Sequence, residues 1–227
     1  MKFFDSLISE TERLISTLPK KEFAAGDSWH DIGESQIIMR RDTAFELEGL
    51  GFNLVTSSEV FDGIILVGDD LDKIKENRRF ARITLVQIED SGDEQKSYNL
   101  IKKIDYVKYH TFPDGYMIRS TSRSHKEAVR VSKNSIKDGI SFQKIGSLLI
   151  EKYKKIIGVK GVRIIFITEQ NANYREAEKI AEKNYAISET LNHVMNSVNF
   201  DCNTCNLKAI CDEVEGMKEL HFNKSDM

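Results

Sequence analysis

Proline and long apolar runs are scarce in this 227-residue chain. Its two prolines, Pro19 and Pro113, exclude collagen-like and proline-rich linker proteins. No apolar run approaches the roughly 18 residues that a membrane-spanning helix needs. Charged residues interrupt the first 18 positions, which argues against a signal peptide. The sequence therefore predicts a cytoplasmic protein with no membrane association.

An excess of charge of either sign is also lacking. The chain has 33 basic and 36 acidic residues and a net charge of −3, so no global attraction to nucleic acid or membranes is expected. The hydrophobic fraction of 40% and the charged fraction of 30% are ordinary for a folded globular protein. A chain of this length can bury enough apolar surface to fold without disulfides or metals.

Helical and strand patterns are mixed along the chain, which predicts an α/β or α+β fold with a mixed sheet flanked by helices. Apolar residues at helical spacing predict an amphipathic helix over 2–18, and the polar stretch 20–35 is interpreted as a linker. Strands are expected at 35–39, 52–56, 63–67, 80–88, 116–120, 128–132 and 162–168. Helices are expected at 94–109, 142–157 and 174–197, with a short one between Ser132 and Gly139. The predicted organisation is a helix and linker (1–34), an α/β domain (35–198) and a cysteine-rich metal-binding tail (199–227).

All three cysteines fall within ten residues, in the pattern C-x2-C-x5-C formed by Cys202, Cys205 and Cys211. Soft thiolates select Zn²⁺, Cu(I) or iron–sulfur clusters, and a zinc site or a [4Fe–4S] cluster takes four ligands. The fourth ligand is then His221, another side chain, an exogenous group or a cysteine of another chain. An iron–sulfur cluster is favoured over zinc, because zinc sites more often pair two C-x2-C units.

The segment from Arg119 to Lys155 contains ten basic and three acidic residues, a net charge of +7. Guanidinium groups beside hydroxyls suit phosphate, so Arg119, Arg123, Arg130 and Lys133 are predicted to bind a phosphorylated ligand. A merely solvated basic face is an equally weighted alternative. Few aromatic residues lie among these charges, which argues against single-stranded nucleic acid as the ligand.

The stretch Arg130-Val-Ser-Lys-Asn-Ser-Ile-Lys-Asp-Gly-Ile-Ser-Phe-Gln-Lys-Ile-Gly146 resembles the acetyl-CoA synthase β subunit of the CO dehydrogenase/acetyl-CoA synthase complex. Thr43-Ala-Phe-Glu-Leu47 and Val67-Gly-Asp-Asp-Leu-Asp-Lys-Ile74 are similar to earlier parts of the same domain. The resemblance implies that Cys202, Cys205 and Cys211 match the first three cysteines for the [4Fe–4S] part of a nickel–iron–sulfur centre. The resemblance also implies that His221 takes the place of the family's fourth cysteine. CoA as a ligand and a corrinoid or CO dehydrogenase-type protein as a partner follow as expectations.

The chain departs from that family after Cys211, because no further cysteine follows and the cysteine–glycine–cysteine pair for the distal nickel has no counterpart. Full CO-methylating synthase chemistry by this chain alone is therefore not expected. The sequence predicts an iron–sulfur protein of anaerobic C1 metabolism, acting in electron transfer, cluster delivery or partnership with a corrinoid protein. The alternatives are a zinc-stabilised interaction module, a nucleic-acid-binding protein with a structural cluster, and a reduced acyl- or methyl-transferring enzyme. A homodimer that shares cluster ligands is also left open.

Overall fold

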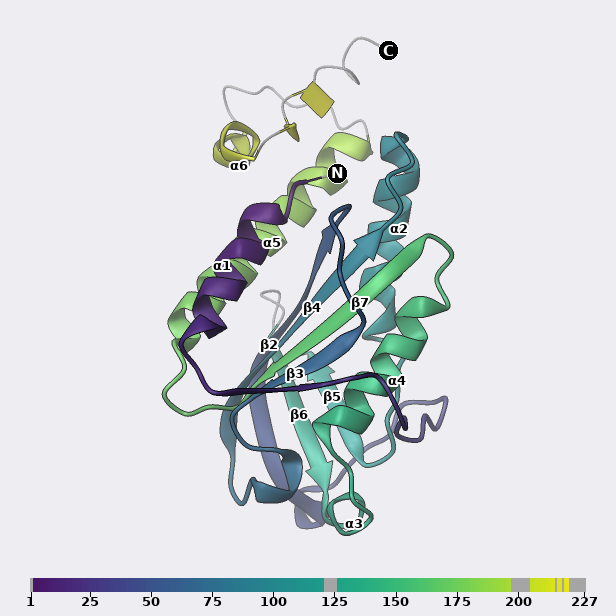
Figure 1. Cartoon of the computed structure of the whole chain (residues 1–227), viewed down its shortest axis with the longest axis vertical. Helices are drawn as coiled ribbons and strands as arrows, with labels where there is room; N and C mark the ends of the chain where they lie inside the picture. Colours follow the sequence, from purple (N-terminus) through teal and green to yellow (C-terminus); the bar gives the residue numbers. More distant parts are fainter. Residues whose placement is uncertain (1, 121–125, 197–204, 215, 218, 221–227) are drawn as a thin grey trace.

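The protein is a seven-stranded mixed sheet with helices on both faces (Figure 1), and the α/β prediction is confirmed. The computed structural model describes residues 2–120, 126–196, 205–214, 216, 217, 219 and 220. The strand order is β1-β3-β7-β4-β2-β6-β5. The strands are β1 (Lys20–Phe23), β2 (Thr43–Thr56), β3 (Gly63–Val67), β4 (Arg78–Ile88), β5 (Tyr116–Ser120), β6 (Lys126–Ser132) and β7 (Val159–Ile167).

Two pairs of helices enclose the sheet (Figure 1). Helices α1 (Asp5–Ser16) and α5 (Tyr174–Met195) pack against each other on one face, and α2 (Glu94–Val107) and α4 (Phe142–Lys154) cover the other. The short elements are η1 (Arg40–Asp42), η2 (Leu71–Lys73), α3 (Lys133–Lys137) and α6 (Lys208–Glu213). Among the described residues, no helix is long and apolar enough to cross a membrane.

The sheet is held by long pairings of apolar strands. Strands β2 and β4 are parallel over ten residue pairs, and β3 runs parallel to β7 with all five of its residues buried. Phe80, Phe142 and Phe166 form an aromatic cluster between the sheet and α4, with Phe142 and Phe166 ring centroids 4.5 Å apart. Burying such large rings supplies much of the hydrophobic stabilisation.

Two predicted helix starts are confirmed by capping contacts. The Ser141 hydroxyl accepts a hydrogen bond from the Lys144 amide at 3.2 Å, and the Ser132 hydroxyl accepts one from the Ser135 amide at 3.0 Å. The end expected at Ile157 is wrong: α4 ends at Lys154, and Gly158, at φ +101°, lies in the turn before β7. The serine caps thus made two helix starts readable from the sequence.

Three expectations about the strands are wrong. The strand expected at 35–39 is absent; in that stretch the Ile38 amide donates to the Met117 sulfur at 3.2 Å instead of joining a ladder. The stretch interpreted as a linker contains β1, which forms one edge of the sheet and pairs antiparallel with β3. Strand β2 starts at Thr43 rather than near Phe52. Its first part contains Gly49 and Gly51, a residue type that disfavours strands in general, but neighbours approach both positions too closely for a side chain: a Cβ would come within 2.2 Å of the Phe80 carbonyl oxygen at Gly49 and within 2.1 Å of Glu127 Cδ at Gly51.

The N-terminal helix shares the hydrophobic core of the sheet. Phe4, Leu7 and Ile15 are buried in the same cluster as the residues of the central strands. The predicted helix over 2–18 is therefore confirmed in kind, with its described bounds at Asp5 and Ser16. The division of the chain at residues 34 and 198 stays a prediction.

Candidate functional site

The cysteine segment follows α5 along the chain. Cys205 and Cys211 are half-buried thiols outside any disulfide, and Cys211 lies in α6, which packs against α5. Lys183 of α5 and Glu213 of α6 form an ion pair of 2.7 Å that joins the two helices. Cys202 and His221 lie outside the described residues. Within the described part of the chain, no three His, Cys, Asp or Glu side chains are grouped so that they could hold a metal.

The predicted phosphate-binding residues are partly brought together by a carboxylate. Arg130 donates through Nε to Glu46 Oε1, and Arg119 Nη2 lies 3.5 Å from the same oxygen. Arg130 also donates to the Ile38 carbonyl at 3.0 Å. Lys133 lies apart from this group, with Nζ donating to the Arg41 carbonyl at 2.7 Å. Arg123 lies outside the described residues, so the described part of the predicted site is an internal ion-pair group centred on Glu46.

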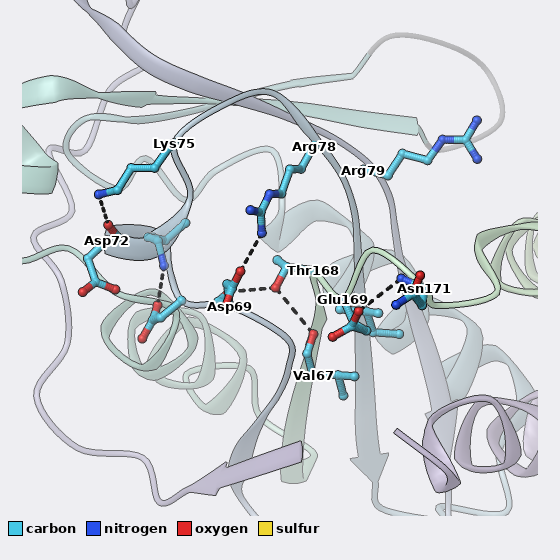
Figure 2. Close-up of polar contacts among 12 residues, drawn as sticks. Val67, Asp69, Asp72, Lys75, Arg78, Arg79, Thr168, Glu169 and Asn171 are labelled. Carbon is cyan, nitrogen blue, oxygen red and sulfur yellow. Dashed lines mark hydrogen bonds and ion pairs between the residues drawn. The ribbon is translucent and has the colours of Figure 1, made fainter. Parts of the chain in front are cut away.

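A second polar group lies where the parallel strands β3 and β7 end (Figure 2), and we call it the β3–β7 loop cluster. The Val67 carbonyl accepts from the Thr168 amide at 2.8 Å, and Thr168 Oγ1 donates to the Asp69 carbonyl at 2.7 Å. Arg78 Nη1 is 2.7 Å from Asp69 Oδ2. The carboxyl ends of neighbouring parallel strands are where open α/β sheets commonly form ligand crevices.

The acids of the Val67–Ile74 motif hold this loop in place. Asp70 Oδ1 accepts hydrogen bonds from the Leu71 amide at 2.7 Å and from the Phe142 amide at 2.9 Å, which ties the loop to the start of α4. Lys75 Nζ donates to the Asp72 carbonyl at 2.8 Å (Figure 2). The motif therefore shapes the ends of the strands through its own backbone and side-chain contacts.

Beside the β3–β7 loop cluster lies a hollow of about 500 Å³, here called the arginine pocket. It is lined by residues around the starts of β4 and α5: Glu76, Asn77, Arg78, Arg79, Gln170, Ala172, Asn173, Tyr174 and Arg175. Arg79 and Arg175 are exposed, and neither forms an ion pair with a described residue. Figure 2 shows Arg78 turned toward Asp69, whereas Arg79 points away from that pair. Exposed guanidinium groups of this kind suit phosphate or carboxylate ligands.

Tyr174 connects the two walls of the arginine pocket. Its hydroxyl donates to the Arg79 carbonyl at 3.2 Å and lies 3.3 Å from the Ile167 carbonyl. Burial, reinforced by the nearby Glu169 charge, raises the pKa of Tyr174 to about 12. The phenol therefore stays protonated at neutral pH and keeps α5 fixed against β4.

The arginine pocket was missed from the sequence because its arginines lie about a hundred positions apart along the chain. The one available signal was local: Arg78-Arg79 opens a strand, and Asn173 is a good N-cap for a helix that begins with Tyr174-Arg175. The Asn173 side chain does accept a hydrogen bond from the Glu176 amide at 3.2 Å.

A buried ion pair joins β4 and β6 across β2. Arg82 of β4 and Glu127 of β6 are 1% and 4% exposed, and Arg82 Nη2 lies 2.8 Å from Glu127 Oε1. Burial disfavours the charged guanidinium, but the Glu127 carboxylate outweighs that effect and raises the pKa of Arg82. Arg82 Nε and Glu127 Oε2 have no hydrogen-bond partner among the described residues.

Gly51 makes this pair possible. It lies on β2 between the two strands, and a Cβ there would come within 2.1 Å of Glu127 Cδ. The Glu127 side chain therefore crosses β2 through the space that a larger residue would fill. In the sequence, Glu127 is one of the three acids of the basic segment, and its crossing of β2 has no local signal because it depends on strand order.

Comparisons with known proteins locate the chain in a family. The model of the CO dehydrogenase/acetyl-CoA synthase complex beta subunit family matches residues 29–172. A relative, the carbon monoxide dehydrogenase/acetyl-CoA synthase subunit alpha of Moorella thermoacetica, is 26% identical over 165 residues. The match covers 70% of this chain and 21% of the relative, so the chain spans about a fifth of that protein.

The family match contains strands β2 to β7, the Glu46 ion-pair group and the buried Arg82–Glu127 pair. It begins after β1 and ends at Ala172, before α5 and the cysteines. The resemblance inferred from the short motifs is thus supported over the α/β part of the chain. This protein belongs to the CO dehydrogenase/acetyl-CoA synthase complex beta subunit family.

Proposed function

We propose that this chain is an iron–sulfur protein of the CO dehydrogenase/acetyl-CoA synthase type. Cys202, Cys205 and Cys211 would hold a [4Fe–4S]-type cluster, with His221 as the fourth ligand. The observation that carries the proposal is the C-x2-C-x5-C pattern in a family member whose sequence has no other cysteine. A role in electron transfer, or as the partner of a corrinoid or CO dehydrogenase-type protein, follows from the family.

The donor set fits such a cluster chemically. Thiolates are the usual ligands of iron–sulfur clusters, and an imidazole can replace a cysteine in some of them. Cys205 and Cys211 are half-buried, so their sulfurs are neither sealed in the core nor fully solvated. The same donors would suit a structural zinc, which is the alternative that the experiment must separate.

Anaerobic purification followed by iron, sulfide, nickel and zinc analysis tests this proposal. The wild-type protein should carry about four irons and four sulfides per chain. Cys202→Ala and Cys205→Ala should lose the metal, and His221→Ala should weaken its retention. The matched control is His30→Ala, which removes an exposed histidine far in sequence from the cysteines and should retain the full iron content. Stoichiometric zinc without iron would contradict the cluster and favour the zinc-stabilised module.

We also propose that the α/β domain binds a phosphorylated ligand such as CoA. The basic segment with Arg119, Arg123, Arg130 and Lys133 stays a prediction for this role. The arginine pocket is the second candidate, favoured by one observation: Arg119 and Arg130 share Glu46, whereas Arg79 and Arg175 have no acidic partner among the described residues. An arginine without a carboxylate is the better receptor for an added anion.

Calorimetric titration with CoA and with inorganic pyrophosphate distinguishes the two candidates. Arg79→Ala/Arg175→Ala should weaken both ligands by about tenfold or more, because each charge-assisted hydrogen bond contributes roughly 1.5–3 kcal/mol. Arg119→Ala/Arg130→Ala is the matched double variant and should leave affinity within about twofold. The reverse pattern would assign the site to the basic segment, and no binding to the wild-type protein would contradict a phosphorylated ligand.

A further inference from the structure

The second half of α2 and the residues that follow α4 enclose a hollow of about 600 Å³, which we call the lysine groove. Helices α2 and α4 cover the face of the sheet opposite α5 (Figure 1), and the groove shares no lining residue with the arginine pocket. The lining residues of the groove are Lys102, Lys103, Tyr106, Val107, Lys155, Ile156 and Ile157.

Apolar side chains are exposed together at the lysine groove. Ile157 is 97% exposed and Tyr106 is 59% exposed, whereas Ile156 is half-buried and Val107 is buried. Single exposed apolar residues are common on protein surfaces, but several that line one hollow are typical of an interaction site. The groove therefore presents an apolar surface that a partner could bury.

The lysines of the groove are exposed, and none of the three forms an ion pair with a described residue. Neighbouring lysines differ in this respect: Lys154 Nζ lies 3.1 Å from Asp62 Oδ2, and Lys160 Nζ lies 3.3 Å from Glu89 Oε2. Among the described residues, no acid lines the groove. Its positive charge is therefore available to an acidic partner.

We propose that the lysine groove is the docking site for an acidic amphipathic helix of a partner protein. The apolar face of that helix packs on Tyr106, Ile156 and Ile157, and carboxylates on its flanks pair with the three lysines. This inference rests on the partner role proposed above and gives that role a surface. It requires neither the cluster nor the phosphate site.

The shape and the lining of the groove favour a protein segment over other anionic surfaces. A hollow between two elements accepts a ridge of side chains, whereas a flat bilayer leaves it unfilled. Nucleic acids are bound through phosphate contacts and stacked bases, to which aliphatic residues such as Ile156 and Ile157 contribute little. Lysine stems lie along apolar surface while the ammonium group reaches outward, which suits a partner with an apolar centre and acidic flanks.

Two synthetic helical peptides of about 15 residues test the docking site. The first carries leucines along one face and glutamates on both flanks, and the second has serine in place of each leucine. In fluorescence anisotropy, the wild-type protein should bind the first peptide at least tenfold more tightly, because only its leucines bury apolar area in the groove. Equal binding of the two peptides, or no binding of the first, would overturn the docking site.

Charge reversal locates the bound peptide. Lys103→Glu/Lys155→Glu should weaken binding of the first peptide by at least tenfold, since it places acids against the glutamates of the peptide. Lys20→Glu/Lys137→Glu is the matched control, because it changes the net charge equally at exposed lysines outside the groove, and it should leave affinity within about threefold. Equal losses in the two variants would mean that attraction is general, and would overturn the groove as the site.

The apolar contact has its own pair of variants. Ile157→Ser should weaken binding of the first peptide by about tenfold, because it removes the most exposed aliphatic side chain of the groove. Ile37→Ser removes another exposed isoleucine, outside the groove, and should leave affinity within about twofold. Wild-type affinity in Ile157→Ser would contradict the proposed packing.

Two further measurements separate this proposal from its alternatives. Cys205→Ala should lose the cluster and still bind the first peptide as tightly as the wild-type protein does. Failure to bind the peptide in a protein that carries about four irons overturns the groove alone, whereas peptide binding by a wild-type protein without iron overturns the cluster alone. Binding to phosphatidylglycerol vesicles, without binding to the peptide, would assign the groove to a membrane surface and overturn the protein partner.

Discussion

The arginines of this protein occur in two contrasting surroundings. Arg119 and Arg130 belong to a segment with a net charge of +7, yet both contact Glu46, which lies more than seventy positions earlier in the chain. Arg79 and Arg175 belong to no such run, yet they line one hollow, together with Glu76, and neither forms an ion pair with a described residue. A basic stretch in a sequence therefore does not by itself locate an anion site; the site depends on which acids the fold brings to each arginine.

The contrast can be ordered by burial. Arg82 is fully buried with Glu127, Arg119 and Arg130 are partly exposed with Glu46, and Arg79 and Arg175 are exposed. Removing an acid should cost most where its arginine is most buried, because an uncompensated charge in a low-dielectric interior is the least tolerable.

The largest effect is expected for Glu127→Ala. It leaves the Arg82 guanidinium buried without its carboxylate, and the free energy of unfolding should fall by about 3–5 kcal/mol. Urea denaturation followed by circular dichroism measures the change. A loss under about 1 kcal/mol would show that water or a rearrangement stabilises the charge of Arg82 in place of Glu127. It would contradict the expectation that the stability cost increases with the burial of the arginine.

A smaller effect is expected for Glu46→Ala, because its arginines keep contact with solvent. The free energy of unfolding should fall by about 1–2 kcal/mol, because partial exposure to solvent weakens hydrogen bonds to charged groups that otherwise contribute roughly 1.5–3 kcal/mol. Glu48→Ala, on the same strand but exposed, is the matched control and should change stability by less than about 0.5 kcal/mol. Equal losses of stability in the two variants would mean that the ion pairs of Glu46 with Arg119 and Arg130 do not stabilise the fold.

Removing the arginines of the pocket should cost less still. Arg79→Ala/Arg175→Ala should change the free energy of unfolding by no more than about 0.5 kcal/mol in the absence of ligand, since both side chains are exposed and lack an ion pair with described residues. Thermal denaturation in phosphate-free buffer checks this. A large loss would mean that the two guanidiniums are structural, and would weaken their case as an anion receptor.

The smallest effect on stability at neutral pH is expected for Tyr174. Its phenol is protonated there in both the folded and the unfolded state, so its titration does not change the free energy of unfolding. Its pKa of about 12 in the folded protein exceeds the value near 10 of an unfolded tyrosine. The folded state therefore holds the phenol proton more tightly, so stability should fall as the pH rises from about 10 to 12. Tyr174→Phe should show a shallower fall over that window. Identical pH profiles of the two proteins would contradict the burial of this hydroxyl.

The sequence was sufficient for the fold class and for most helices, because caps such as Ser141 and apolar runs such as Gly63–Val67 report on local geometry. It was insufficient for β1, whose residues are largely exposed and show no apolar alternation, and for the first half of β2. The arginine pocket and the Arg82–Glu127 pair depend on strand order, which no local pattern encodes. Cys202 and His221 lie outside the described residues, so the metal site stays a prediction.

The side chain that crosses β2 at Gly51 also has a consequence for how the sheet assembles. Side chains alternate between the faces of a strand, so a one-residue slip of β4 against β2 would turn Arg82 to the opposite face, away from Glu127. Both charges would then be buried alone. The pair therefore specifies register: it adds little to the stability of a correctly aligned sheet but strongly destabilises a misaligned one. Because it spans β4, β2 and β6, it favours one alignment of all three strands.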